Sequence, residues 1–227
     1  MVRSKKEKDK IVRPYRNNLP SEKELEGNPK FNLEISKFRG GLEFDLFDVS
    51  KFLEKYRKNP NLVDLIKQWG DNPGYIREYL ERIKNKNFSD FKVKRNFGRS
   101  ESFRDSECNQ IWSDTICQFI FEEKGLYSAC LGFEYYNKNS ILVPQIQGVS
   151  GRGRSLESIK WPNALLNLTI EWAKAFNFSE IMVLPSKRNQ WEGVKSKNSR
   201  AKMYYDFTAK REGFEYDSER QVFFKKI

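Results

Sequence analysis

The sequence contains no histidine among its 227 residues. Histidine is the usual general base near neutral pH and a common metal ligand, so its absence excludes Ser-His-Asp triads, Cys-His nucleophile pairs and histidine metal sites. Any catalytic group must therefore be Glu, Asp, Tyr, Lys, Ser, Cys or the main chain, and we expect no metal centre.

Cysteine is scarce. The chain has three cysteines without CxxC spacing, which argues against a zinc ribbon and against a disulfide framework. Cys117 and Cys130 lie within apolar stretches and are expected to be buried. Cys108 is flanked by polar residues, and without a neighbouring base it is a poor nucleophile.

Long apolar runs are also missing. No segment approaches the roughly 18 apolar residues that a membrane helix requires. The charged N-terminus lacks the apolar region of a signal peptide. We therefore expect a cytoplasmic protein without membrane contact, whose length fits one large domain.

Positive charge is in excess, with a formal net charge of +11. The lysines and arginines concentrate in residues 3–16, 82–99 and 187–211. Such a field attracts polyanions, among them nucleic acid, acidic protein segments and phosphorylated cofactors. A solvated, lysine-rich surface would give the same pattern, and the sequence leaves both explanations open.

Composition divides the first half of the chain into two regions. Residues 1–30 are charged, rich in proline and without apolar periodicity, so they are expected to form a flexible basic arm. Residues 31–109 are expected to hold a strand and then helices. Three apolar stripes at helical spacing between residues 48 and 86 are interpreted as core faces. Residues 84–107 are polar and basic and indicate a loop or a ragged strand.

Residues 110–227 alternate between strand and helix patterns. Strands at 115–121, 126–136 and 140–147 are expected to form a meander. A helix from Pro162 to about residue 177, a buried strand at 179–184, a helix ending at residue 212 and a closing hairpin follow. The order β-β-β-α-β-α-β-β predicts an α/β fold with a mixed sheet.

Two local features lie at the end of the meander. Pro144 cannot donate to a sheet ladder, so we expect it where one side of its strand is unpaired or bulged. A glycine- and arginine-rich loop then follows. The N–H groups of such a loop, with the positive end of the next helix, form a phosphate site, unless the loop is only a flexible turn. The loop comprises Gln147, Gly148, Val149, Ser150, Gly151, Arg152, Gly153 and Arg154.

Together these segments resemble the GNAT acyltransferase superfamily over roughly residues 110–227. Residues 145–150 are similar to the family's Gln/Arg-x-x-Gly-x-Gly/Ala signature. Asn198, Ala201 and Tyr205 match its Asn-x-x-Ala-x-x-x-Tyr spacing, and residues 213–214 resemble its closing Gly-Phe.

The resemblance implies a cofactor and a site. Acetyl-CoA, or another acyl-CoA, would bind by its pyrophosphate at residues 147–154 and lay its pantetheine arm in a gap between two splayed strands. Asn198 would orient that arm, and Tyr205 would protonate the departing thiolate. A helix cap for Asn198 and simple packing for Tyr205 are the structural alternatives.

The chain departs from the family pattern at three places. Ser150 replaces a smaller residue of the signature, and Ala209 stands where the family's tyrosine usually lies, one helical turn after Tyr205. Glutamines 145 and 147 stand where a catalytic glutamate is frequent. Glu134 on the preceding strand is then the nearest carboxylate able to deprotonate an amine, unless it is a solvated strand residue.

Three functions follow as hypotheses. The first is an N-acyltransferase, most simply one that moves an acetyl group from acetyl-CoA to a primary amine by direct attack in a ternary complex. The basic surface predicts an acceptor that is anionic or carried on RNA. The second is a catalytically inactive GNAT-like module that binds nucleic acid. The third is an interaction protein in which residues 31–100 bind a partner.

Overall fold

The computed structural model describes residues 48–227, with the exception of 71, 98–101, 105–109, 113–114, 150 and 189–202. The expected arm at residues 1–30 and the strand expected near residue 31 lie outside the described residues. So do three residues that carry part of the resemblance, Ser150, Asn198 and Ala201.

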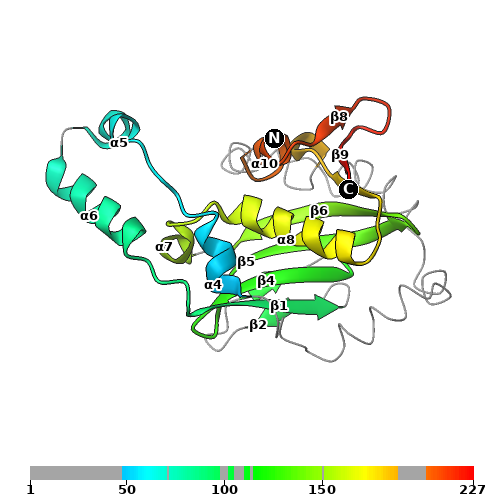
Figure 1. The fold of residues 1–227 in the computed structure, drawn as a ribbon, viewed down its shortest axis with the longest axis horizontal. Helices are drawn as coiled ribbons and strands as arrows, with labels where there is room; N and C mark the ends of the chain where they lie inside the picture. The colour runs from blue at the N-terminus through cyan, green and yellow to red at the C-terminus, as the bar shows by residue number, and fades with distance from the viewer. Residues whose placement is uncertain are drawn as a thin grey trace, which may run out of the picture.

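A seven-stranded mixed sheet forms the centre of the molecule, in the order β1-β4-β5-β6-β7-β9-β8 (Figure 1). Every neighbouring pair is antiparallel except β6 with β7, which is parallel. The mixed α/β class expected from the sequence is therefore confirmed. The strands are β1 (Phe91–Phe97), β4 (Cys117–Glu123), β5 (Leu126–Asn137), β6 (Ser140–Gly148), β7 (Glu180–Val183), β8 (Glu215–Asp217) and β9 (Val222–Lys226).

The first strand differs from its prediction. β1 pairs with β4 along its whole length, where the sequence indicated a loop or a ragged strand. Phe91 and Val93 are buried while Lys92 is exposed, so alternation is present but short and masked by flanking lysines. A separate ladder joins β2 (Ser102–Arg104) to β3 (Gln110–Trp112).

Helix α8 (Trp161–Ala175) and the short helix α4 (Val49–Glu54) cover one face of the sheet (Figure 1). The centre of the core is aromatic. The ring centroids of Phe119 and Phe133 lie 5.5 Å apart, and Trp172 of α8 lies 4.9 Å from Phe133. Such pairs stabilise the packing beyond the apolar area they bury. Pro162 in the first turn of α8 agrees with the prediction.

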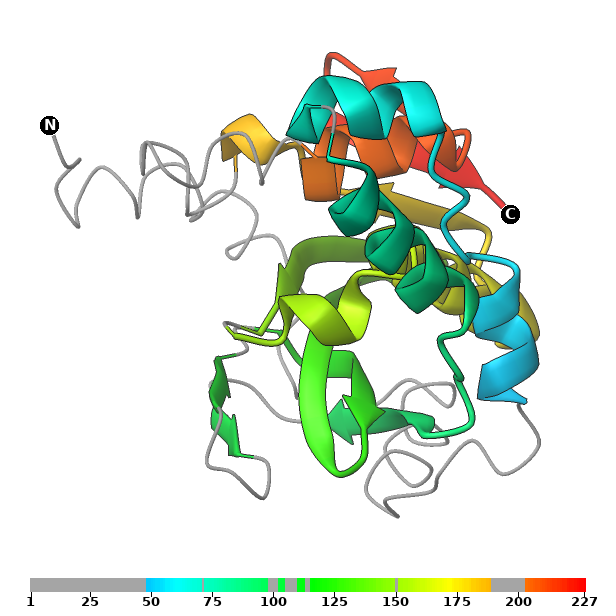
Figure 2. The same cartoon turned by 90° about the vertical axis from the view of Figure 1, so that its left-hand side faces the viewer.

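Two further helices form an arm that stands away from the sheet (Figures 1 and 2). They are α5 (Leu62–Trp69) and α6 (Pro73–Lys84). The Asn61 and Asn72 side chains cap them by accepting from Val63 N and Tyr75 N.

The apolar stripes of the arm do not join the main core. Leu65, Ile76, Tyr79 and Ile83 form a small separate cluster, whereas Phe52 and Leu53 of α4 belong to the main core. The stripes are therefore core faces, as expected, but those of α5 and α6 face a small core of their own and leave Leu62 and Ile66 exposed. A pair of short helices buries too little apolar surface to be stable alone, so its attachment to the body matters.

Arginine side chains attach the arm. Arg57 donates to the carbonyls of Ile83 (2.5 Å), Lys84 (3.2 Å) and Lys86 (2.7 Å), which terminate α6. Arg82 makes a two-point ion pair with Glu157, at 2.9 and 3.1 Å. These bonds fix α6 against α4 and against the segment that precedes α8. Across the described ranges, no helix is long and apolar enough to cross a membrane.

Candidate active site

Strands β6 and β7 part in the middle of the sheet. They pair only where Ser140–Val143 lies beside Glu180–Val183, and the last bond is from Leu184 N to Val143 O at 3.0 Å. β7 ends there, but β6 continues to Gly148. Beyond residue 143, no strand among the described residues pairs with this edge of β6, and we call the parting of the two strands the gap.

A bulge on β6 coincides with the parting. One β5 residue, Phe133, separates Gly132 from Glu134, whereas two residues, Val143 and Pro144, separate their partners on β6. The extra residue bends the strand and redirects its N–H groups. The prediction that Pro144 occupies a bulged or half-paired position is confirmed.

Tyr205 lies at the gap. Its hydroxyl accepts a hydrogen bond from the N–H of Ile146, two residues beyond the bulge, at 2.8 Å, and the side chain is only 3% exposed. Tyr205 lies in η2 (Met203–Phe207), a π-helix that leads into α10 (Thr208–Arg211). The neighbouring Tyr204 packs on Trp161 at the start of α8, with ring centroids 4.8 Å apart. A phenol and a main-chain donor thus meet where the two strands separate.

A cavity of about 290 Å³ lies beside this point, at the N-terminus of α8. Its walls come from the first turn of α8, from η2 with α10, and from the segment after α4. The cations Lys58, Lys160 and Arg211 line it, and no acidic residue does. Lys160 precedes the first turn of α8, where no side chain caps the helix. Cations at the positive end of a helix make this cavity suitable for an anionic group.

The surroundings of Lys58 shift its pKa. Burial lowers the pKa of Lys58, and the charge of Glu157 acts in the opposite direction. The sequence analysis did not identify this cavity. The sequence feature that could have pointed to it is Lys160-Trp161-Pro162, a helix start that carries a positive charge and has proline in its first turn.

The loop predicted to bind phosphate lies elsewhere. Val149 N donates to Ser128 O at 2.9 Å, and Arg152 N donates to Val149 O at 3.2 Å, which closes a tight turn around Gly151 with a φ of +81°. The short helix α7 (Gly153–Leu156) follows. None of the described loop residues, 147–149 and 151–154, lines the cavity at α8.

The two arginines of the loop remain available for a ligand. Among the described residues, the side chains of Arg152 and Arg154 make no hydrogen bond or ion pair, and Arg152 Nε is buried without a partner. A buried guanidinium nitrogen without an acceptor is costly, which favours an anion at this loop as well.

A buried polar network holds the loop in place. Ser155, next to Arg154, donates to Glu123, which also pairs with Lys86 at the base of the arm. Ser128 on β5 lies 2.9 Å from the Ser155 hydroxyl. The loop, the sheet and the arm are therefore joined through one carboxylate.

The remaining candidate residues are placed as follows. Glu134 is 4% exposed and lies opposite Leu142, before the bulge. Its neighbour Phe133 packs on α8, so by strand alternation Glu134 faces the other side of the sheet. Gln147 pairs with Cys130 on β5. Ala209, at the position of the family's tyrosine, is fully buried in the core.

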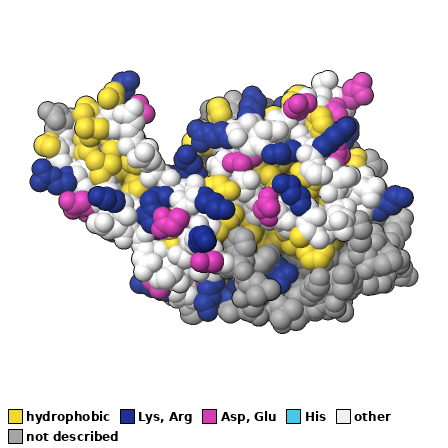
Figure 3. All heavy atoms as spheres, in the orientation of Figure 1, with side chains coloured by type: hydrophobic (Ala, Val, Ile, Leu, Met, Phe, Trp, Pro, Cys, Tyr) yellow, Lys and Arg dark blue, Asp and Glu magenta, His cyan; other side chains and the backbone are white. Residues whose placement is uncertain are grey.

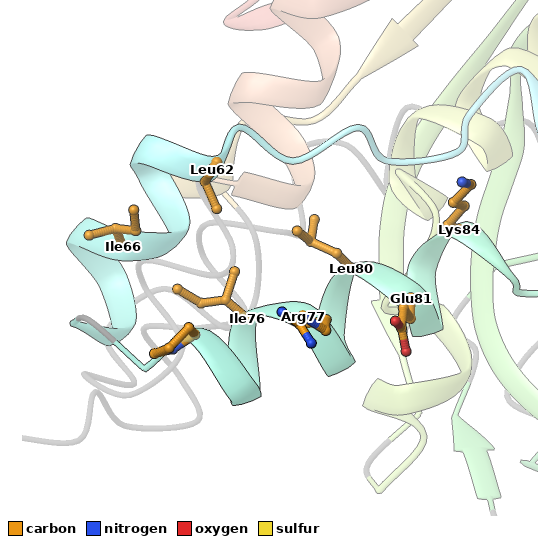
Figure 4. Close-up of a pocket in the computed structure, with 8 residues that line it drawn as sticks. Leu62, Ile66, Ile76, Arg77, Leu80, Glu81 and Lys84 are labelled. Carbon is orange, nitrogen blue, oxygen red and sulfur yellow. The ribbon is translucent and has the colours of Figure 1, made fainter.

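A second, larger cavity of about 460 Å³ lies between the helices of the arm (Figure 4). Leu62, Ile66, Ile76 and Leu80 provide its apolar wall, and Leu62 is 53% exposed. Figure 3 shows apolar side chains gathered on the arm. An exposed apolar surface of this kind is typical of a contact site.

No family model and no curated protein matches the sequence. Among solved structures, the chain is similar to Ard1 from Thermoplasma volcanium, with 11% identity and a TM-score of 0.30 over 48% of this chain and 70% of that one. It is also similar to the N-acetyltransferase PseH of Campylobacter jejuni, with 13% identity and a TM-score of 0.29 over 78% of this chain and 93% of that one. Neither similarity assigns a role to a residue of this chain.

Proposed function

We propose that the protein is a GNAT-type N-acyltransferase that moves an acetyl group from acetyl-CoA to a primary amine. One observation carries the proposal: the gap between β6 and β7, in which the N–H of Ile146 and the hydroxyl of Tyr205 meet at 2.8 Å. Acyl transfer from a thioester requires a donor for the carbonyl oxygen and a proton for the thiolate. This gap brings together one group suited to each task.

In the proposed reaction, the neutral amine attacks the thioester carbonyl carbon, so that a C–N bond forms and the C–S bond breaks. The Ile146 N–H, which donates to Tyr205 in the free protein, would donate instead to the carbonyl oxygen and stabilise the negative charge that develops there. Tyr205 gives its proton to the thiolate and recovers one from the nitrogen of the amide product, so no net proton is consumed. Glu134 is the carboxylate proposed from the sequence to assist the amine.

Two anion sites are candidates for the phosphates of the donor. The cavity at α8 lies next to Tyr204 and combines Lys58, Lys160 and Arg211 with a helix N-terminus. The glycine-rich loop offers Arg152 and Arg154. We favour the cavity, because η2 provides one of its walls as well as the tyrosine in the gap.

Calorimetric titration with acetyl-CoA tests the proposal. Lys160→Ala/Arg211→Ala is expected to weaken binding at least about tenfold, since each charged hydrogen bond contributes about 1.5–3 kcal/mol. Arg152→Ala/Arg154→Ala tests the loop in the same way. Lys174→Ala, near the other end of α8, is the matched control and is expected to bind like the wild type. No saturable binding at millimolar acetyl-CoA would refute the acyltransferase.

The second candidate is a catalytically inactive module that binds nucleic acid. The cations that line the α8 cavity favour it, together with Phe207 on the cavity wall, which is 53% exposed and available for stacking. Single-stranded RNA would then bind with an affinity that falls steeply between 50 and 200 mM salt, while acetyl-CoA does not bind. If both ligands bind, an amine acceptor carried on RNA is the substrate class to examine.

A further inference from the structure

Two adjacent residues of η2 bind the chain on both sides of the gap. Tyr205 accepts from Ile146 N on β6. Asp206 accepts from Ser186 twice, from the backbone N–H at 2.8 Å and from the hydroxyl at 2.7 Å. Ser186 begins the short 3₁₀ helix η1 (Ser186–Arg188) just after β7 ends, and it is 5% exposed. The helix that carries the tyrosine is thus tied to both strands where they separate.

The double contact is made from a π-helical turn. Consecutive side chains of a helix point in different directions, so Tyr205 and Asp206 reach opposite sides of the gap. Thr208 adds a side-chain bond to the carbonyl of Met203 at 3.0 Å, which spans the widened turn. Single π turns are rare in proteins, and many of those that do occur lie at functional sites.

We propose that Asp206 is the positioning residue for Tyr205. Its two bonds to Ser186 set how far η2 lies from the end of β7, and this separation sets where the Tyr205 hydroxyl stands relative to Ile146 N. The chemical use of this placement rests on the proposed acyl transfer, because the hydroxyl must stand where the thiolate departs. The placement itself is a property of the free protein and can be measured without any ligand.

Hydrogen exchange of the Ile146 amide, followed by NMR, measures the placement. Tyr205→Phe removes the acceptor and is expected to raise the exchange rate about tenfold, the effect of losing one ordinary hydrogen bond. Asp206→Ala is expected to approach this increase. Asp206→Asn retains an oxygen for the Ser186 N–H and is expected to fall between Asp206→Ala and the wild type.

Two controls separate positioning from general destabilisation. Asp217→Ala removes another carboxylate that accepts from backbone N–H groups, those of Glu219 and Arg220, and is expected to leave Ile146 unchanged. Amides of the buried strand β4 should exchange at wild-type rates in Asp206→Ala. The inference is overturned if Asp206→Ala leaves Ile146 unchanged, or if it accelerates β4 by the same factor.

Acetyl transfer from acetyl-CoA to a primary amine carried on RNA, with an aminoacyl-tRNA as the probe, then links placement to chemistry. Asp206→Ala is expected to lower kcat with little change in the KM for acetyl-CoA, and Asp206→Asn to restore part of kcat. A purely structural role would not produce this split. Selective exchange at Ile146 without any acetyl-CoA binding would retain the positioning role and refute the proposed function. Acetyl transfer by the wild type, with an unaffected Ile146 amide in Asp206→Ala, would retain the proposed function and refute the positioning role.

Discussion

Gly132 on β5 is the glycine at which an added methyl group should lower the unfolding free energy most. A Cβ atom at Gly132 would lie 2.2 Å from Oγ1 of Thr115 and 3.0 Å from its Cβ and Cγ2. Thr115 is fully buried and has no room to withdraw. Its hydroxyl also donates to the carbonyl of Cys117 at 3.3 Å and accepts from the Gln118 side chain at 3.2 Å.

We therefore expect Gly132→Ala to cost about 3 kcal/mol of unfolding free energy, at the upper end of the range for overpacked cores. For a chain of this size, that corresponds to a fall in Tm of about 6–12 °C. Urea denaturation followed by circular dichroism measures the free energy. Gly74→Ala in α6 is the matched control, because its new Cβ would meet only Asn72 Oδ1 at 3.8 Å. That variant should be neutral or slightly stabilised.

A double-mutant cycle identifies the cause. Thr115→Ala removes the two atoms that Gly132→Ala would meet other than Cβ, so the double variant should be more stable than the sum of the single effects predicts. A cost below about 0.5 kcal/mol for Gly132→Ala would refute the reasoning. So would a cycle without coupling, because the close contact would then not be what the methyl group meets.

Two further outcomes concern the arm and a half-buried phenol. Arg57→Ala removes the donor to three carbonyls, so it should lower the unfolding free energy by about 1–3 kcal/mol and accelerate hydrogen exchange at the end of α6. Arg57→Lys should restore little of this loss. Unchanged exchange in Arg57→Ala would contradict the expectation. For Tyr56, burial, followed by the charges of Glu212 and Glu171, raises the pKa to about 12. The unfolded phenol ionises near pH 10, so the free energy of unfolding should fall between pH 10 and 12, by at most about 1.4 kcal/mol per pH unit, and less steeply in Tyr56→Phe.

The second half of the fold was predictable from local patterns. β4 is buried at every position and β5 at most, so both appear as apolar runs, and Lys124 and Gly125 between them adopt positive φ angles that suit a tight turn. Pro144 marked the bulge because its missing N–H restricts it to such a position. These signals each depend on a few adjacent residues.

The candidate site depends on contacts between distant segments. The bond from Ile146 to Tyr205 joins residues 59 positions apart, and the α8 cavity is built from three separate parts of the chain. The π-helical turn that orients Tyr205 leaves no mark in the hydrophobic period. The separate packing of the arm could not be predicted for a related reason, since an amphipathic stripe has the same pattern whether it packs on the main core or only on a second helix.

The strands on the two sides of the parting between β6 and β7 differ in length. They also differ in the order in which they can join the sheet. β4, β5 and β6 have seven to twelve residues and are joined by short turns, whereas β7, β8 and β9 have three to five. Local contacts form quickly, so the meander can fold first and serve as the template on which the C-terminal strands dock. The gap is created only by that docking. A nascent chain therefore lacks the contact between Ile146 and Tyr205, and the gap beside it, until η2 and the strands that follow it are in place.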